Sequence, residues 1–560
     1  MFLSLETRIS RGYRVHLEQS VPTISFLATT VNSNMPVFSL LTSLLGVVAL
    51  ILYKLLSSIR EKRRQHAESV RRGCGPCPML PKKDILGITR FRESIRATRA
   101  ERGPKYIVES LDAKGKHVHT AQVRVLDYDL NVTRDPENAK ACFSSQSHDF
   151  DIGLHRTQSW KPLLGTGIFT SQGEAWKHSR ALVRPQFSKE QTSDLDLAGR
   201  HTQELLDKVV PGVDGWTDSI DLQPLFYNFA LDTVTEFLYG YSVHAQNHDA
   251  HATLPTISGM DEPNLLELGA NFDQGKRWIE ERGAFYKWYW LMFSKDFDHR
   301  CREIHKLVDW FVQTRLQGGE KGRDSEVEDG KKRFILLNEL AKETQNPLEL
   351  RNESLSLLFA GRDTAGALLG WVFYFLARHE RVFRKLRSIV LDTFGSSITG
   401  EINFAQLKAC QYMLHMINEC FRVAAVIPLN ERVAVRDTTL PRGGGPDGSQ
   451  PIFIPKGRQI LIATYAMQHR ADIWGEDVEE FKPERWERRK VGWEFIPFGA
   501  GPRSCLGQQF SLTETSYVVV RFLQRFDRIE NMEEPGPIRL HHAIENRSGS
   551  GVQVRLHAAN

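Results

Sequence analysis

The stretch FGAGPRSCLG, residues 498–507, decides the fold, because an ordinary turn does not require so many fixed residue types at one spacing. Gly499 and Gly501 permit tight turns, and Cys505 stands just before a run whose apolar residues fall on one helical face. Amide donors and the positive end of a helix dipole favour the thiolate over the thiol at such a position. The alternative is a buried structural cysteine in a glycine-rich turn, the commoner role of a lone cysteine.

This stretch resembles the proximal haem loop of the cytochrome P450 family, which has the pattern F-G-x-G-x-R-x-C-x-G. The resemblance implies that Cys505 is the axial ligand of a haem b iron, that Arg503 pairs with a haem propionate and that Phe498 shields the sulfur from water. Gly507 would let the following helix approach the macrocycle. The resemblance therefore predicts a haem-thiolate monooxygenase, because a thiolate ligand favours cleavage of the O–O bond.

Further candidates for propionate binding lie upstream. Trp176 and Arg180 stand one helical turn apart in the segment WKHSR, where the family sets an indole and a guanidinium against a propionate. The alternative for this pair is a surface cation–π contact. By the same resemblance Arg432, four residues after Pro428, is another propionate ligand.

The segment AGRDT, residues 360–364, resembles the oxygen-activation motif of the family's long central helix. Ala360 and Gly361 would leave space over the iron for dioxygen, and Asp363 and Thr364 would form a proton relay. The alternative is that the Thr364 hydroxyl bonds back to the preceding helical turn.

A charge triad is expected behind the haem. Glu419 and Arg422 form an E-x-x-R pair on a predicted helix, and the family joins them to an arginine that corresponds to Arg485 in the segment FKPERW, residues 481–486. A buried charged cluster of this kind must be fully paired to be tolerated.

The N-terminal region contains an apolar run, PVFSLLTSLLGVVALILYKLL, at residues 36–56, long enough to cross a bilayer as one helix. A cleaved signal peptide is the alternative, but the run is long and no small-residue cleavage pattern follows it. More basic residues follow the run than precede it, so the bulk of the chain is expected in the cytosol. Residues 1–35 are then an extension, either lumenal or absent from a product that starts at Met35.

Residues 57–85 are predicted to be a basic, proline-rich linker, and residues 86–560 the monooxygenase domain. Cys74 and Cys77 in the linker have the spacing of a dithiol redox site, but no βαβ unit surrounds them, which argues against a thioredoxin-like centre. The expected fold is mainly α with small β-sheets (α+β), the cytochrome P450 fold, preceded by a single transmembrane helix.

Composition narrows the function. The 560 residues include 73 Lys and Arg against 68 Asp and Glu, and the basic residues are scattered outside one cluster near residues 60–72. This balance argues against nucleic acid as a partner. Seven cysteines at scattered positions do not indicate a disulfide framework.

The segments PLNERVA (residues 428–434) and RDTTLPRGGGPDG (residues 436–448) resemble the fungal n-alkane-inducible hydroxylases, which act on the terminal carbon of alkanes and fatty acids. Ala365 and the pair Ala424 and Ala425 depart from that branch, which normally has a second threonine and an aromatic-proline pair there. The expected substrate is therefore an alkane, a fatty acid or a lipid-like intermediate of secondary metabolism.

The resemblance implies a single-pass protein of the endoplasmic reticulum membrane that receives electrons from NADPH-cytochrome P450 reductase, with cytochrome b5 as an optional second donor. Two alternatives keep the haem. One is a haem-thiolate enzyme that rearranges peroxides, and the other is a non-catalytic haem-binding protein. The presence of both Asp363 and Thr364 argues against each of them.

Overall fold

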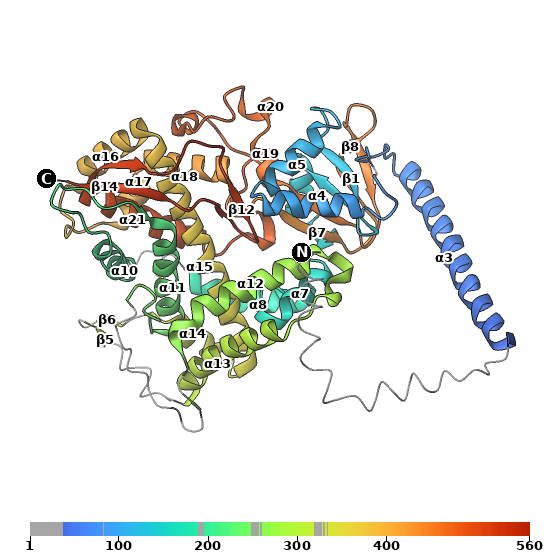
Figure 1. The fold of residues 1–560 in the computed structure, drawn as a ribbon, viewed down its shortest axis with the longest axis horizontal. Coiled ribbons are helices and arrows are strands. Elements are labelled where there is room, and N and C mark those ends of the chain that lie inside the picture. The colour runs from blue at the N-terminus through green and yellow to red at the C-terminus, as the bar shows by residue number, and fades with distance from the viewer. Residues whose placement is uncertain are drawn as a thin grey trace. The chain divides into compact units, whose positions relative to one another are not determined.

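Helix α15 (Pro347–Arg378) forms the centre of the fold (Figure 1). Asn346 caps its start by accepting hydrogen bonds from the backbone N–H groups of Leu348 and Glu349, and Pro347 takes the first helical position. Most of its side chains are buried, as the continuous apolar pattern of this segment predicts. The computed structural model describes residues 37–81, 83–188, 195–247, 257, 260–261, 263–317, 327–328, 331–332 and 334–559.

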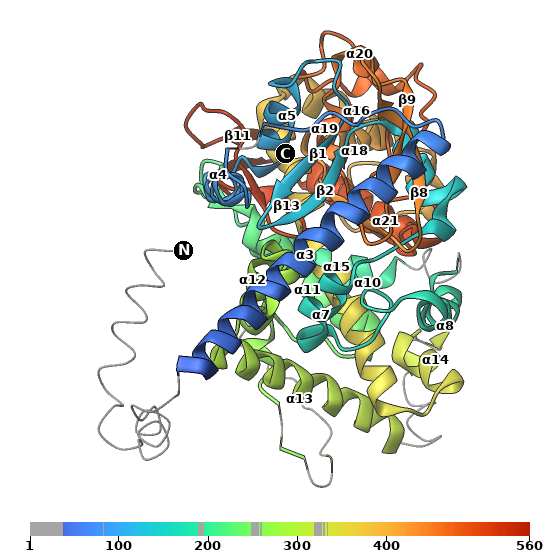
Figure 2. The ribbon, with the colours of Figure 1, turned by 90° about the vertical axis from the view of Figure 1, so that its right-hand side faces the viewer.

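Helices make up most of the described part of residues 72–560, and α7, α11, α13 and α18 lie against α15, which runs through the centre of Figure 2. The other helices of the described chain have the following bounds: α3 Val37–Arg71, α4 Ile88–Arg99, α5 Gly103–Asp112, α6 Pro136–Lys140, α7 Leu154–Leu164, α8 Gly173–Val183, α10 Asp196–Asp207, α11 Leu222–Tyr239, α12 Leu268–Ala284, α13 Lys295–Gln317, α14 Leu336–Glu343, α16 Glu380–Phe394, α17 Phe404–Ala409, α18 Gln411–Ala424, α19 Thr464–Gln468, α20 Ala471–Trp474 and α21 Gln508–Arg525. Short helical turns include η5 (Tyr286–Leu291), η6 (Pro483–Trp486) and η7 (Gly501–Arg503).

Two glycines bring α11 and α15 close together. A Cβ atom at Gly361 would lie 2.6 Å from Cγ2 of Val234, and one at Gly366 would lie 2.9 Å from the ring of Tyr227. Both neighbours belong to α11. Gly361 therefore serves the packing of two helices, which differs from the expected role of leaving space for dioxygen.

Replacing Gly361 with alanine is expected to destabilise the protein by about 1–3 kcal/mol, because the added methyl group overpacks the contact with Val234. That loss exceeds the gain of about 1 kcal/mol that alanine brings inside a helix. Gly370 is a matched control on the same helix, since a Cβ atom there has its nearest neighbour at 3.6 Å. Urea unfolding in detergent measures both variants, and equal stabilities of Gly361→Ala and Gly370→Ala would contradict the packing role.

The sheets are small, which confirms the prediction of a mainly α fold with minor β structure. The largest sheet has the strand order β1-β2-β10-β7-β3, and the others have the orders β11-β14-β4, β12-β13, β5-β6 and β8-β9. The strands have the following bounds: β1 Thr120–Val125, β2 Tyr128–Thr133, β3 Phe150–Asp151, β4 Ile220–Asp221, β5 Val327–Glu328, β6 Lys331–Lys332, β7 Asn430–Ala434, β8 Thr438–Gly444, β9 Gln450–Ile454, β10 Gln459–Ile462, β11 Phe526–Asn531, β12 Leu540–His542, β13 Asn546–Ser548 and β14 Gln553–Ala558.

The antiparallel pairing of β3 with β7 matters for function. It sets Asp151 opposite Val433, directly beside Arg432. Helix α7 follows β3 at once and carries Arg156. Asp151, Arg156 and Arg432 therefore meet at one edge of the sheet. Arg432 is far from the other two in the sequence, and no motif links the three.

Helix α3 is long and apolar enough to cross a membrane over Ser43–Arg71. It does not end at Leu56, where the predicted span ends, but continues to Arg71 through part of the predicted linker. No glycine or proline interrupts residues 57–71, and ion pairs of 2.6 Å join Glu61 to Arg64 and Glu68 to Arg71. The predicted extension 1–35 lies outside the described residues.

The proline-rich part of the predicted linker, from Arg72 onward, belongs to the second unit, residues 72–560. The backbone N–H of Gly75 donates to the Pro451 carbonyl at 2.9 Å, and that of Leu80 donates to the Gln122 carbonyl at 3.0 Å. Burial raises the pKa of Cys77 to about 12. A redox-active cysteine needs a lowered pKa, so this environment agrees with the argument against a thioredoxin-like centre.

Candidate active site

Cys505 sits on a turn between η7 and the start of α21, and the backbone fixes this turn tightly. Its N–H donates to the Phe498 carbonyl at 2.9 Å. Gly501 has φ +67°, and a Cβ atom there would collide with the Phe143 carbonyl oxygen. Only glycine fits this position, because a side chain would be strained and would clash.

Cys505 is the only exposed residue among the seven cysteines. It borders a recess of about 770 Å³ whose wall also includes Trp176 and Arg180. The recess is open on one side, so the Cys505 thiol is accessible, although neighbouring protein atoms still desolvate it. The ring of Phe498 packs edge-on against that of Phe421 at a centroid distance of 5.1 Å, beside this turn.

The helix position and burial have opposite effects on the pKa of Cys505. Burial raises the pKa of Cys505, while the backbone N–H of Gly507 and the charge of Arg180 lower it less. Without a cation at the sulfur, burying the thiolate anion costs free energy. A bound metal cation removes that cost, because it deprotonates a coordinating thiol outright.

Four arginine side chains converge beside the cysteine turn, from four separate elements: Arg156 of α7, Arg180 of α8, Arg432 of β7 and Arg503 of η7. The guanidinium carbon of Arg503 lies 4.2 Å from the ring centroid of Trp176. Arg180 donates to the Ser504 carbonyl at 3.0 Å, next to Cys505. Trp176 and both of these arginines therefore lie together, as their motifs predict.

These arginines repel one another. Burial lowers the pKa of Arg432 to about 10, and the charges of Arg503 and Arg156 contribute to this shift. Burial also lowers the pKa of Arg503 to about 10, although Asp151 opposes the shift through an ion pair of 2.6 Å. The second carboxylate nearby, Glu431, is bonded to His155 and Gln459, with the Gln459 amide donating to it at 2.6 Å.

This arrangement fits an anionic group with two carboxylates. Four guanidinium groups face two carboxylates, which leaves an excess of about two positive charges, the charge of two haem propionates. The buried Nε of Arg156 has no hydrogen-bond partner among the described residues. A buried donor without a partner indicates a missing acceptor, since such a group costs about 1–3 kcal/mol. The residues around Cys505 therefore fit a haem.

The two residues of the expected proton relay have other partners in this structure. The Thr364 hydroxyl donates to the Ala360 carbonyl at 2.7 Å, which is the local back-bond given above as the alternative. Asp363 is buried and accepts from Lys276 at 2.9 Å and from Arg362 at 3.0 Å. The Thr364 oxygen can still accept a hydrogen bond through its lone pairs.

The structure confirms the predicted charge triad. Arg422 donates twice to the Glu419 carboxylate, at 2.9 Å each, and Arg485 donates to it at 3.3 Å. The Trp486 indole and the Lys482 backbone N–H complete the set of donors at 2.9 and 3.0 Å. Glu419 and Arg422 are fully buried, and each charge is paired.

Ala424 and Ala425, at the end of α18, are buried in the core. Their carbonyls accept hydrogen bonds from the side-chain amide of Asn546 at 2.5 and 3.4 Å. Asn546 begins β13, so this contact fixes the β12–β13 hairpin to the end of α18. The Ala424–Ala425 departure from the fungal branch thus lies where the β12–β13 hairpin is held against α18.

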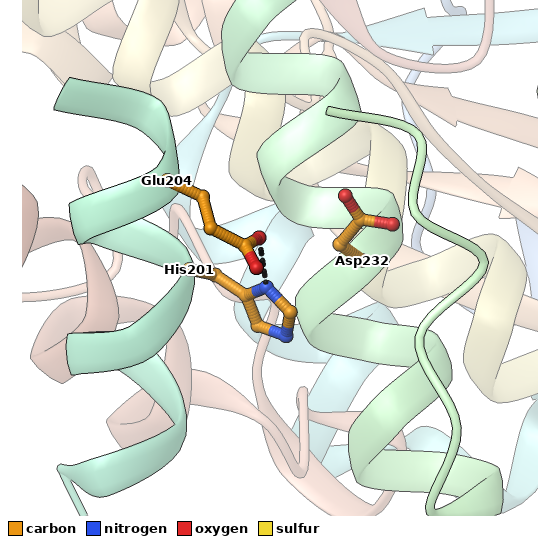
Figure 3. Close-up of side chains that lie close together, drawn as sticks. All are labelled: His201, Glu204 and Asp232. Atoms are coloured by element: carbon orange, nitrogen blue, oxygen red, sulfur yellow. Dashed lines mark hydrogen bonds and ion pairs between the residues drawn. The ribbon is translucent and has the colours of Figure 1, made fainter. Parts of the chain in front are cut away.

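His201, Glu204 and Asp232 are residue types that bind metals, but protein groups already occupy their ligand atoms (Figure 3). His201 Nδ1 pairs with Glu204 at 2.9 Å and Nε2 pairs with Glu236 at 2.5 Å, so neither ring nitrogen is free. Asp232 accepts from Ser242 and from two backbone N–H groups. The group is a buried ion cluster that joins α10 to α11.

This cluster makes stability depend on pH. Burial opposes the charge on His201, but Glu204 and Glu236 outweigh it and raise its pKa to about 9. Because the folded pKa is raised, the stabilisation is complete below the unfolded pKa of about 6.5 and is lost as the pH rises through about 9. The shift corresponds to a loss on the order of 3 kcal/mol. Urea unfolding from about pH 6.5 to about pH 9 should show a smaller loss in His201→Gln than in the unchanged protein, and equal losses would contradict the argument.

Comparison with known proteins agrees with this geometry. A family model described as Cytochrome P450 matches residues 105–545. Cytochrome P450 monooxygenase g430 of a Fusarium species is 42% identical over 513 residues, which cover 91% of this chain and 89% of that protein. Cytochrome P450 52A13 of Debaryomyces hansenii is 40% identical over 415 residues, covering 73% and 78%. Cytochrome P450 monooxygenase himC of Aspergillus japonicus is 39% identical over 518 residues, covering 92% and 88%.

Proposed function

The chain belongs to the cytochrome P450 family, whose members bind haem through a cysteine thiolate, and from this premise we propose that it is a membrane-bound monooxygenase that hydroxylates an aliphatic C–H bond of a hydrophobic substrate. The observation that carries the proposal is the accessible Cys505 beside an excess of buried arginine charge. A peroxide-rearranging enzyme is the second candidate, and the presence of Asp363 and Thr364 favours the monooxygenase.

In this proposal Cys505 is the axial ligand, and Arg503, Arg432, Arg180 and Trp176 hold the propionates. When bound, the haem supplies the activation of dioxygen and the transfer of one oxygen atom to a C–H bond. The Phe498 carbonyl accepts a hydrogen bond from the Cys505 N–H. The Phe498 side chain would limit access of water to the sulfur. Arg156 joins the propionate ligands as a residue that no sequence motif indicates, because only the fold brings α7 to this place.

Asp363 and Thr364 are proposed to move protons to the reacting oxygen. Asp363 is buried between two cations, and burial raises its pKa although Lys276 and Arg362 oppose the shift. Thr364 lies in the next position of the same helix, and its hydroxyl would pass on a proton by turning its single O–H from the Ala360 carbonyl to the reacting oxygen. The protein thereby delivers protons along α15 while apolar side chains exclude bulk water.

The proposed substrate is an alkane, a fatty acid or a lipid-like intermediate of secondary metabolism. Similarity to Cytochrome P450 52A13 supports the first two, and the buried Ala424 and Ala425 support a pocket that differs from that branch. Membranes that contain the chain and a cytochrome P450 reductase should convert dodecanoic acid or hexadecane to hydroxylated products only with NADPH and dioxygen. Saturating turnover of dodecanoic acid would reject the secondary-metabolite substrate. If the membranes convert a fatty acid hydroperoxide without NADPH, and convert neither dodecanoic acid nor hexadecane with NADPH, the result would favour the peroxide-rearranging enzyme.

We assign residues 36–56 as the membrane anchor, residues 57–85 as the linker and residues 86–560 as the domain that faces the cytosol at the endoplasmic reticulum. Exposed apolar side chains support contact with a membrane: Trp290 is 57% exposed, Phe293 85% and Ile85 82%. Two hydrogen bonds bring their segments together, from the Trp288 indole to the Leu126 carbonyl and from the Asp127 N–H to the Leu86 carbonyl. Release of the full chain by alkaline carbonate would contradict the anchor.

The proposed electron donors are NADPH-cytochrome P450 reductase and, as an optional second donor, cytochrome b5. Arg184 lines the recess beside Cys505 and is not one of the proposed propionate ligands, so its positive charge suits an acidic partner through long-range attraction. Reduction rates by the reductase should fall as salt rises. Rates that do not change with salt would contradict this docking surface.

A further inference from the structure

A buried glutamate joins three segments near the start of α15. Glu353 is 1% exposed. The backbone N–H of Ile168, in the loop between α7 and α8, donates to its carboxyl group at 3.2 Å. The hydroxyl of Ser179, on α8, also donates to the ionised carboxylate. Glu353 therefore links α15 to both the loop and α8 by hydrogen bonds.

The loop between α7 and α8, residues 165–171, packs tightly on the first turns of α15. A Cβ atom at Gly165 would collide with the Asn352 side chain, and one at Gly167 would collide with the Ser356 hydroxyl. Two glycines are therefore needed for the loop to approach the helix this closely. This close approach brings a buried backbone donor of the loop to a buried acceptor of the helix, and each satisfies the other.

The loop and α8 each lead to an arginine beside Cys505. At the end of the loop, the Ser171 carbonyl accepts a hydrogen bond from Arg503 at 3.0 Å. On α8, Ser179 is followed directly by Arg180, which donates to a carbonyl of the cysteine turn at 3.0 Å. A displacement of the loop or of α8 from α15 therefore moves a guanidinium group of the candidate active site.

The surroundings of Glu353 keep its carboxyl group neutral below pH 7. Burial raises its pKa to about 7, although its two hydrogen bonds oppose the shift. The charged groups that face it are Glu349 on its own helix and His178 on α8, and these two pair with each other at 2.6 Å. The loop, residues 165–171, has no titratable side chain. At about pH 6 a glutamine at this position therefore has the same charge as the protonated carboxyl group.

We propose that Glu353 is a positioning residue of the haem site, an inference that rests on the proposed function, in which Arg503 and Arg180 hold the propionates. Its hydrogen bonds fix the loop and α8, and with them both arginines. Positive charge held near an iron centre favours the reduced form, because that form carries one positive charge less. Loss of the hydrogen bonds at Glu353 should therefore lower the reduction potential of the haem.

The reduction potential of the purified holoprotein at about pH 6, where Glu353 is protonated, tests this role. Glu353→Gln can still accept from the Ile168 N–H and bond the Ser179 hydroxyl, so its potential should equal that of the unchanged protein. Glu353→Leu has a similar size and the same charge but makes no hydrogen bond. Its ratio of ferrous to ferric protein at a fixed applied potential should fall about tenfold, which is about 59 mV for one electron. Equal potentials of the two variants would overturn the proposal.

A milder pair of variants covers the case in which Glu353→Leu does not fold. Ser179→Ala removes the hydrogen-bond partner on α8 and should lower the same ratio about threefold. Ser354→Ala removes a hydroxyl that is also buried but faces Tyr239 of α11, so the ratio should stay that of the unchanged protein. A ratio that falls equally in both variants, or in neither, would contradict the positioning role.

Two further measurements separate this role from a loss of stability and from failure of the proposed function. Asp232→Leu removes a buried acceptor of two backbone N–H groups at α11, and it should lower stability without lowering the ratio. A ratio as low as that of Glu353→Leu would assign the effect to destabilisation and overturn the proposal. Absence of hydroxylated product from the unchanged protein with reductase and NADPH rejects the proposed function, whereas the difference between Glu353→Leu and Glu353→Gln decides the positioning role.

Discussion

Replacing Cys505 with alanine (Cys505→Ala) is expected to abolish hydroxylation, down to the background of membranes without the chain. Alanine offers no ligand to iron, and the electron donation that favours O–O cleavage comes from the thiolate. The reduced, carbon-monoxide-bound spectrum should lose its red-shifted Soret band. The turn itself should persist, because the bond from the residue 505 N–H to the Phe498 carbonyl involves only backbone.

Cys410→Ala is the matched control. Cys410 is a buried thiol at the start of α18, and removal of its sulfur should leave both spectrum and turnover unchanged. A red-shifted band that survives in Cys505→Ala, in protein with unchanged circular dichroism, would remove the haem-thiolate assignment and the proposed function with it.

The second large effect is expected at Glu419. Glu419→Gln removes the charge that pairs with Arg422, which is fully buried and would remain as an uncompensated cation. Breaking a buried pair in this way costs about 3–5 kcal/mol. Because domains of this kind are stable by only about 5–15 kcal/mol, most of the variant should fail to accumulate as folded holoprotein. Haem content per chain and urea unfolding measure the loss.

Glu484→Gln provides the comparison. Glu484 also holds two cations, Arg381 at 2.8 Å and Lys385 at 3.0 Å, but its partners are exposed to solvent. An exposed pair of this kind is worth about 0–1 kcal/mol, so the variant should accumulate normally. Equal yields of Glu419→Gln and Glu484→Gln would show that burial does not set the importance of the triad.

Short motifs on single elements could be predicted from the sequence. The cysteine turn, the E-x-x-R pair and the central helix depend on residues close together in the chain, where spacing and periodicity carry the information. The charge triad was predicted because the family resemblance supplied its third member, Arg485, and the structure confirms it. The mainly α class followed from the long apolar and amphipathic segments.

Residues that meet only through tertiary contacts could not be predicted. Arg156 and Asp151 reach Arg432 because β3 pairs with β7, and no spacing in the sequence indicates that pairing. Lys276 reaches Asp363 although the two are 87 positions apart in the sequence. Gly361 was assigned to an open space because its neighbour Val234 lies on another helix.

Local signals do not give the full energetics of Cys505 or the full length of α3. Desolvation of the sulfur outweighs the favourable helix end, and ion pairs between neighbouring turns extend α3 beyond its apolar part. Local signals fail where a competing contribution comes from burial or from side-chain pairing.

The four arginines beside Cys505 make the stability of the folded protein depend on haem. Unless an anion neutralises them, their repulsion favours the unfolded chain, so the cofactor acts as a ligand that selects the folded state. We therefore expect newly made chains that fail to capture haem to be degraded first. Production of the protein in a host should therefore rise with added haem precursor, even when synthesis of the chain stays constant.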